Sequence, residues 1–107
     1  MTGEADFLTE VTERLVSIGG VTSRAMFGGY GIFHDGDMFA LISKASLYFK
    51  VDDSNLAAYE QAGSQRFKPM PYYEVPADVF EDTDKLTDWA RTSIAVAHAL
   101  AAKKKRR

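Results

Sequence analysis

The sequence predicts an α+β fold, in which a mainly antiparallel sheet of about five strands is covered by helices. Near both ends of the chain, apolar residues recur three and four positions apart, a spacing typical of amphipathic helices. Between them lie short strand-like runs separated by glycine, proline and aspartate. Because the links between neighbouring runs are too short for parallel crossovers, these strands must pair antiparallel. The expected order is α-β-β-β(β)-α-β(β)-α.

The composition indicates one domain with a basic end. The chain has 107 residues, of which 15 are acidic and 13 basic, and it has no cysteine. Five of the basic residues stand together at 103–107, so the other eight face all 15 acidic residues and give residues 1–102 a formal charge of −7. We therefore expect a single acidic domain over residues 1–102, followed by a basic, disordered tail at 103–107.

The first half of the chain is expected to form one helix and then a meander of strands. The helix is expected from Glu4 to Ile18 and is ended by Gly19-Gly20. Asp35-Gly36 between two β-prone runs is typical of a type I′ hairpin turn, which needs positive φ at both central residues. The expected strands are Ser23–Phe27, Tyr30–Phe33, Met38–Ser43 and Leu47–Val51.

The second half is expected to be mostly helical around two short strands. Asp53 or Ser54 is expected to cap a first helix, and Asp82 or Thr83 a second one. Prolines flank the strands between them, and because proline cannot donate to a ladder, these strands should lie at an edge of the sheet. The expected elements are a short helix ending at Gly63, edge pieces at Arg66–Phe67 and Tyr72–Val75, a turn at Ala77–Phe80, and a final helix with the apolar face Leu86, Trp89, Ala90, Ile94, Ala97 and Leu100.

Several classes of function are excluded or disfavoured. The absence of cysteine excludes disulfides, zinc ribbons, thiol nucleophiles and iron–sulfur clusters. The longest apolar-rich stretch, Ile94–Ala102, is about half the roughly 20 residues needed to cross a bilayer. With no signal-peptide pattern at the start, we expect a cytoplasmic protein without membrane contact. The glycine run at 28–31 precedes strand-like sequence and no G-K-[ST], which favours a tight bend or bulge over a phosphate cradle.

A metal site is considered at the predicted hairpin tip. His34 lies beside Asp35 and Asp37, which offers one imidazole and two carboxylates. No second ligand stands at a suitable spacing, and His98 is 64 residues away. We expect solvated turn residues, and no metal or cofactor.

An enzymatic site is considered at Glu74. This carboxyl group lies among Tyr72 and Tyr73 and would suit acid–base chemistry if the rings buried it. A solvent-facing residue on an edge strand is the simpler interpretation, because alternation sends neighbouring side chains to opposite faces of the sheet.

Aromatic residues crowd the middle of the chain. Ten of the 13 lie between positions 27 and 73, more than one covered sheet face needs. Some should therefore be exposed or line a groove near Arg24, Lys50, Arg66 and Lys68, as at binding surfaces. The alternative is that tyrosine rings shield the open sheet face from water.

Four motifs follow one another along the chain: RAMFGGYGIF at 24–33, MFALI at 38–42, LYFKVD at 47–52 and MPYYEVP at 70–76. Together they resemble the N-terminal domain of the TfoX/Sxy family. The resemblance covers about residues 5–100 and implies an α+β fold with a mainly antiparallel sheet. Long members of the family are regulators of natural competence that work with a transcriptional activator and carry a second, helical domain. We expect a stand-alone first domain that lacks the second. The resemblance implies no catalytic residues.

These observations predict a non-enzymatic regulatory domain, monomeric or homodimeric, that binds a protein partner of unknown identity. The expected contact residues are Arg24, Phe27, Gly28, Gly29, Tyr48, Lys50, Tyr72, Tyr73 and Glu74. A first alternative is a DNA-associated transcriptional regulator with weak, salt-dependent contacts through Lys103, Lys104, Lys105, Arg106 and Arg107. A second is a small-molecule-binding or enzymatic domain around Glu74 and Tyr73.

Overall fold

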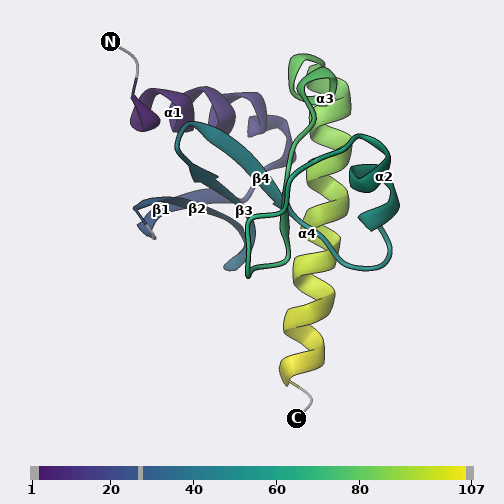
Figure 1. The fold of residues 1–107 in the computed structure, drawn as a ribbon. Coiled ribbons are helices and arrows are strands. Elements are labelled where there is room, and N and C mark those ends of the chain that lie inside the picture. The colour runs from purple at the N-terminus through teal and green to yellow at the C-terminus, as the bar shows by residue number, and fades with distance from the viewer. Residues whose placement is uncertain (1–2, 27, 106–107) are drawn as a thin grey trace.

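Five strands form one sheet, and helices pack against it, in the computed structural model, which describes residues 3–26 and 28–105 (Figure 1). The strands lie side by side in chain order, and all neighbours pair antiparallel. The predicted α+β class, strand number and pairing are confirmed. The strands are β1 (Val21–Met26), β2 (Gly29–His34), β3 (Asp37–Ser43), β4 (Ser46–Lys50) and β5 (Tyr72–Glu74). The helices are α1 (Glu4–Arg14), the 3₁₀ turn η1 (Val16–Ile18), α2 (Leu56–Gln61), α3 (Ala77–Glu81) and α4 (Thr83–Lys105).

Two tight hairpins place β3 at the centre of the sheet. Between β2 and β3, Asp35 has φ 49° and Gly36 has φ 91°, so the predicted turn with two positive φ angles is confirmed. Between β3 and β4, Lys44 and Ala45 also have positive φ, at 51° and 60°. Such turns match the twist of the strands that they join.

The helices cover one face of the sheet. Residues directly opposite one another in antiparallel strands share a face, and pairing aligns Ile32, Ala40 and Phe49 in one row. These side chains belong to a single buried cluster, to which every α-helix contributes. The helical members are Val11, Tyr59, Val79, Leu86, Ala90, Ile94 and Ala97, and Leu15 joins them from the turn after α1. The other face of the sheet, called the outer face below, receives the loop residue Phe67, whose ring centre lies 5.2 Å from that of Tyr48.

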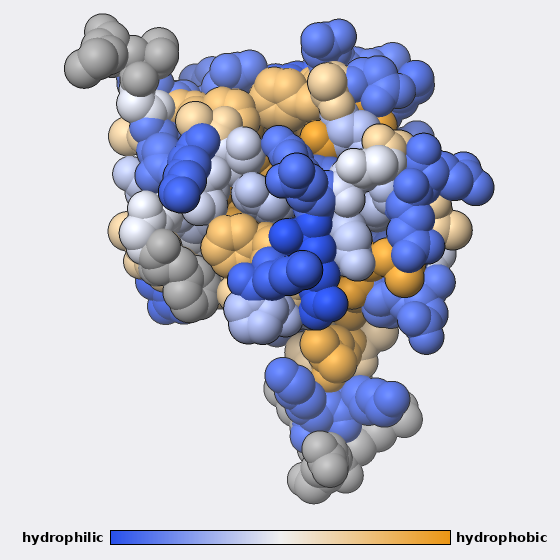
Figure 2. Space-filling model, viewed as in Figure 1, coloured by the Kyte–Doolittle hydropathy of each residue, from blue (hydrophilic) through white to orange (hydrophobic). Residues whose placement is uncertain are grey.

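The last helix is longer than expected. Asp82 caps it as predicted, because its Oδ1 accepts from the backbone N–H groups of Asp84 at 3.0 Å and Lys85 at 3.2 Å. The helix then continues through Lys105, so 103–105 are helical and not a disordered tail; 106 and 107 lie outside the described residues. The alanine-rich run before the lysines favours helix, and cations suit a helix C-terminus. Figure 1 shows α4 running past the sheet, and Figure 2 shows hydrophilic side chains gathered at that end.

Three other local expectations are corrected. The first helix stops at Arg14 and is followed by η1, since helix ends often tighten into 3₁₀ turns. The expected turn after Pro76 is the short helix α3, held by packing of Phe80 against Phe7 with ring centres 5.6 Å apart. Neither Asp53 nor Ser54 caps α2, because Asp52 folds into an Asx turn by accepting from Ser54 N–H at 2.8 Å.

The glycine run combines a turn with close packing. Gly28 has φ +73° and forms the bend before β2, as the sequence predicted. Gly29 and Gly31 are buried within β2, where bare backbone lets other groups approach. Those groups are the backbone of Ile42 and the sulfur atoms of Met26 and Met38, rather than mainly aromatic rings.

No helix among the described residues is long and apolar enough to cross a membrane.

Candidate functional site

A row of aligned residues crosses the outer face on all five strands. Cross-strand pairing aligns Arg24 on β1 with Gly31, Leu41, Tyr48 and Glu74 on the following strands. Strands lie about 4.8 Å apart, so the row spans about 19 Å. It has a cation at one end and an acidic residue at the other, and Gly31 and Leu41 between them are buried. We call these five residues the outer row.

Two cations of the outer face lie over aromatic rings. The guanidinium carbon of Arg24 is 4.9 Å from the ring centre of Phe33, and Lys50 Nζ is 5.5 Å from that of Tyr72. Both distances are typical of cation–π contacts. Within residues 3–26 and 28–105, neither cation forms an ion pair. Arg24 is exposed, so its charge is available to an acidic partner.

The environment of Lys50 is partly desolvated. Burial lowers the pKa of its ammonium group, the positive charge of Lys104 lowers it further, and Asp37 opposes the shift. These groups line a small cavity of about 170 Å³ beside the C-terminal half of α4. An anionic ligand at this end of the sheet would relieve the repulsion between the two lysines, but it would also meet the Asp37 carboxylate.

The predicted contact residues do not form one surface. Tyr72 is only 2% exposed. Tyr73 faces the core, with its ring centre 5.9 Å from that of Tyr59, and Gly29 is buried. Phe27 lies outside the described residues. The members left at the surface are Arg24, Gly28, Tyr48, Lys50 and Glu74.

Sequence reasoning missed the apolar neighbours of this surface. Met26 and Met38 lie over Gly31, and Phe33 lies beside them. The signal was present in the alternation of β2, because Gly31 and Phe33 are two positions apart and share a face. Arg66, which was grouped with the surface cations, instead holds its own loop by donating to the carbonyls of Met70 and Pro69, each at 3.0 Å.

Glu74 lines a groove of about 600 Å³ at one end of the sheet. Phe7 of α1 and Phe80 of α3 line it, together with Ala45 of the β3–β4 turn and Ser46 at the start of β4. Glu74 is the one titratable side chain among the described residues that line this groove. Acid–base chemistry needs a carboxyl group within reach of a reacting partner. The groove offers room for a ligand but no second catalytic group of this kind.

Glu74 also acts on its neighbour in the outer row. The pKa of the Tyr48 phenol is raised, first by burial and then by the negative charge of Glu74. Both effects favour the neutral phenol, which can donate a hydrogen bond.

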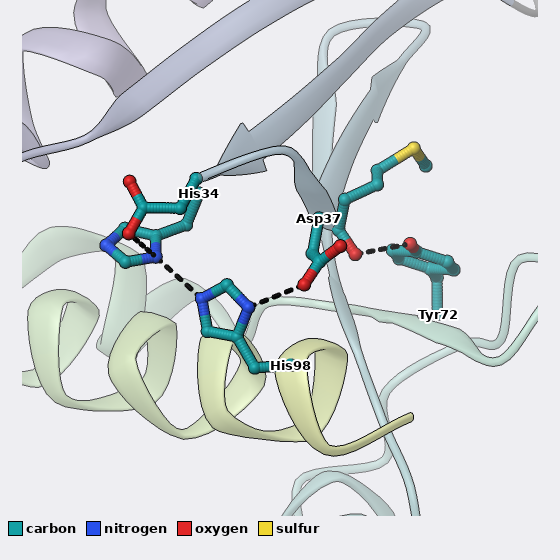
Figure 3. A network of polar contacts seen from close by, with 6 residues as sticks. His34, Asp37, Tyr72 and His98 are labelled. Carbon is teal, nitrogen blue, oxygen red and sulfur yellow. Dashed lines mark hydrogen bonds and ion pairs between the residues drawn. The ribbon is translucent and has the colours of Figure 1, made fainter. Parts of the chain in front are cut away.

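The structure joins the two histidines, which are far apart in sequence (Figure 3). His34 Nδ1 lies 2.8 Å from His98 Nε2, and His98 Nδ1 lies 2.6 Å from Asp37 Oδ2. The expectation that His98 would be remote from His34 is wrong. The tip of the β2–β3 hairpin lies against the C-terminal half of α4, so the fold supplies the second imidazole that the sequence spacing did not.

One set of tautomers satisfies both hydrogen bonds of this cluster. A carboxylate accepts, so His98 donates to Asp37 from Nδ1–H. In that tautomer His98 Nε2 accepts, and His34 donates its Nδ1–H. Asp35 Oδ2 lies 3.6 Å from His34 Nδ1, on the exposed side of the cluster. A signal for this contact existed in the sequence, because His98 interrupts the apolar face of the last helix four residues after Ile94.

The family is identified by comparison with known proteins. The model of the TfoX N-terminal domain matches residues 13–97, which include the outer row and His34. Over 51 residues the chain is 37% identical to the DNA transformation protein TfoX1 of Aliivibrio fischeri (strain ATCC 700601 / ES114). The aligned segment covers 48% of this chain and 24% of that protein, so the chain matches about a quarter of its curated relative's length. The chain belongs to the TfoX N-terminal domain family.

Proposed function

We propose that this chain is a non-enzymatic regulatory domain that binds another protein through the outer face of its sheet. The observation that carries the proposal is the outer row, in which exposed Arg24 has no ion-pair partner among the described residues and the partly exposed Tyr48 and Glu74 lie at the opposite end. Protein interfaces commonly combine an apolar centre with a polar rim.

The composition of the outer face supports binding to a protein. Arginine and tyrosine are the side chains that most often carry binding energy, and Arg24 and Tyr48 supply one of each. The sulfur atoms of Met26 and Met38 give the middle of the face an adaptable apolar surface. A complementary partner would place an acidic group opposite Arg24 and a basic group opposite Glu74.

The family suggests the process. The relative from Aliivibrio fischeri is named for DNA transformation. We propose that this chain regulates a process of that kind, and that its partner is a transcription regulator. That assignment rests on the likeness alone, whereas the binding face rests on the residues above.

A charge reversal tests the binding face. Arg24→Glu changes the exposed end of the outer row, and Arg91→Glu is the matched control, because Arg91 is exposed on α4 at the other side of the sheet. Purified variants are used to capture proteins from nuclease-treated extract, and the captured partner is then titrated. We expect Arg24→Glu to lower the affinity for the partner at least tenfold, and Arg91→Glu to leave that affinity unchanged. Equal binding by both variants would overturn the proposal.

DNA association is a second candidate, favoured by the helical placement of the basic end. Lys103 and Lys104 are exposed on α4 beyond the sheet. Their contact with phosphates should weaken as the salt concentration rises. In a plot of the logarithm of the binding constant against the logarithm of the salt concentration, the magnitude of the slope should fall by about 0.9 for each contact removed. The test is a gel shift with Lys103→Glu/Lys104→Glu against Lys85→Glu, an exposed lysine at the other end of α4. Equal affinities of the two variants would exclude this role for the helix end.

A further inference from the structure

We propose that His34, His98 and Asp35 form a binding site for a zinc-class divalent transition-metal ion, with Asp37 as the residue that orients His98. One ligand atom from each of the three residues lies within 4.8 Å of the others. The proposal is independent of the protein-binding role of the outer face.

The distances fit a single ion with small movements. Zinc binds imidazole nitrogen at about 2.0–2.1 Å, and tetrahedral geometry then separates two ligand atoms by about 3.3 Å. His34 Nδ1 and His98 Nε2 are 2.8 Å apart, and His34 Nδ1 and Asp35 Oδ2 are 3.6 Å apart. These two pairs therefore need changes of about 0.5 Å and about 0.3 Å. The third pair, between His98 and Asp35, lies within 4.8 Å and would close by movement of the Asp35 side chain. Asp35 has freedom to complete the set, because its side chain is 69% exposed.

The hydrogen bond between His98 and Asp37 resembles those that orient histidine ligands in metal sites. Histidine ligands almost always donate their second ring N–H to a carboxylate or a carbonyl, which fixes the tautomer and the ring orientation. Asp37 Oδ2 accepts from His98 Nδ1 at 2.6 Å, so the Nε2 lone pair is aimed at the place where the ion would lie. On binding, His34 would take the tautomer with its proton on Nε2 and present Nδ1 to the metal.

The backbone holds Asp35 in place beside the histidines. Asp35 N–H donates to the carbonyl of Gly20 at 3.2 Å. Gly20 has φ +72°, and a Cβ there would lie 2.6 Å from Asp35 Oδ1 and 3.4 Å from His34 Nε2. Glycine at position 20 therefore leaves the space in which these two side chains pack together.

The residue types select the ion. Two imidazoles and one carboxylate suit zinc, nickel or copper better than magnesium or calcium, which prefer oxygen ligands. Three protein ligands leave a fourth position, which can face water on the exposed side of Asp35. A bound ion would link α4 to the β2–β3 hairpin and so stabilise the C-terminal half of that helix against the sheet.

Zinc titration of the untagged chain tests the site. His34 and His98 are the only histidines, and there is no cysteine, so binding through imidazole has one possible location. We expect one Zn²⁺ per chain by calorimetry, a visible absorption band of tetrahedral type with Co²⁺, and a rise in the melting temperature that EDTA reverses. In the wild-type protein, the imidazole nitrogen signals of both histidines should shift in NMR spectra.

Variants separate this site from casual binding to surface carboxylates. We expect His34→Ala and His98→Ala each to lower zinc affinity at least tenfold, and Asp37→Asn to lower it by about 10–100-fold through loss of orientation. Asp78→Asn is the control, because it removes an exposed carboxylate on α3 and should change nothing. Circular dichroism checks that each variant is folded. The variant that combines His34→Ala with His98→Ala should lose the site. The proposal is overturned if zinc does not saturate at one ion per chain, if this double variant binds zinc as tightly as the wild-type protein, or if the wild-type imidazole signals do not move.

Discussion

Gly29→Ala should be among the most damaging single-methyl additions in the sheet. A Cβ at position 29 would overlap the carbonyl oxygen of Ile42 and lie 3.1 Å from its carbonyl carbon. Ile42 belongs to the central strand β3, where it pairs with Tyr30 on one side and Leu47 on the other. Its carbonyl cannot move without displacing hydrogen bonds of the sheet, so the added methyl group has no soft neighbour to push aside.

The expected cost follows from two contributions. Overpacking of a buried site costs about 1–3 kcal/mol. Displacing a ladder hydrogen bond costs about 1 kcal/mol more. We therefore expect Gly29→Ala to lower the free energy of unfolding by about 2–4 kcal/mol, a large part of the 5–15 kcal/mol that is typical of such domains. The melting temperature should fall by roughly 8–16 °C.

Gly31→Ala is the matched control, because it adds the same methyl group two residues away on the same strand face. There the Cβ would meet the sulfur atoms of Met26 and Met38 and would lie 3.2 Å from Cε1 of Phe33. Methionine side chains can rotate away. Alanine also reduces the entropy of the unfolded chain, and this effect offsets about 0.4–1 kcal/mol of the stability lost through the added methyl group. The net change should stay below about 1 kcal/mol.

Urea denaturation followed by Trp89 fluorescence measures both variants. Trp89 is the single tryptophan, and its ring lies 4.8 Å from that of Tyr59 in the core, so it reports global unfolding. A Gly29→Ala variant within about 1 kcal/mol of the wild-type protein would show that β3 yields easily. Equal losses for the two variants would show that the type of neighbouring atom does not decide the cost.

Three further changes test the cap, a buried phenol and a buried hydroxyl. Asp82→Ala removes the acceptor for two N–H groups of α4 and should lower the free energy of unfolding by about 1 kcal/mol in urea titrations. Burial raises the pKa of Tyr72 to about 12, so the neutral phenol is favoured in the folded state. This contribution to stability should be intact below pH 10, and about 2.7 kcal/mol of it should be lost as the pH rises from 10 to 12. Tyr72→Phe should reduce that loss in melting curves recorded at alkaline pH. Ser93→Ala should lower the free energy of unfolding by only about 0.5–1.5 kcal/mol in urea titrations. The carbonyl of Lys50 then loses the Ser93 hydroxyl as a donor, but it still accepts from the side-chain amide of Asn55 at 3.2 Å.

Local chemistry made much of the fold predictable. Asp35-Gly36 requires its turn because of backbone sterics, and Asp82 caps α4 because unsatisfied N–H groups need an acceptor. The end of α2 just before Gly63, which has φ +71°, follows from the same kind of local rule. Each of these features involves groups only a few residues apart, so the sequence pattern contains both partners.

The binding face was less predictable, because it depends on which side of the sheet the helices cover. Alternation separates Tyr73 from Glu74, but it does not say which of the two meets the core. That choice is made by packing of Tyr73 against Tyr59, which comes from a different element. Composition could therefore indicate that the chain has more aromatic side chains than one covered face of the sheet can bury. Only the pairing register shows which of these side chains lie on the outer face.

The histidine cluster shows the same limit for chemistry. His34 was recognised as a possible ligand and set aside because spacing rules offered no partner, yet the partner lies 64 residues away at 2.8 Å. Metal-ligand spacing rules work when ligands share one helix or one loop, since chain geometry then fixes the distance between them. Here the distance depends on where α4 crosses the hairpin tip, which the whole core determines. A polar residue on an apolar helix face, such as His98, is therefore a reason to search the rest of the chain for a partner and not only its neighbours.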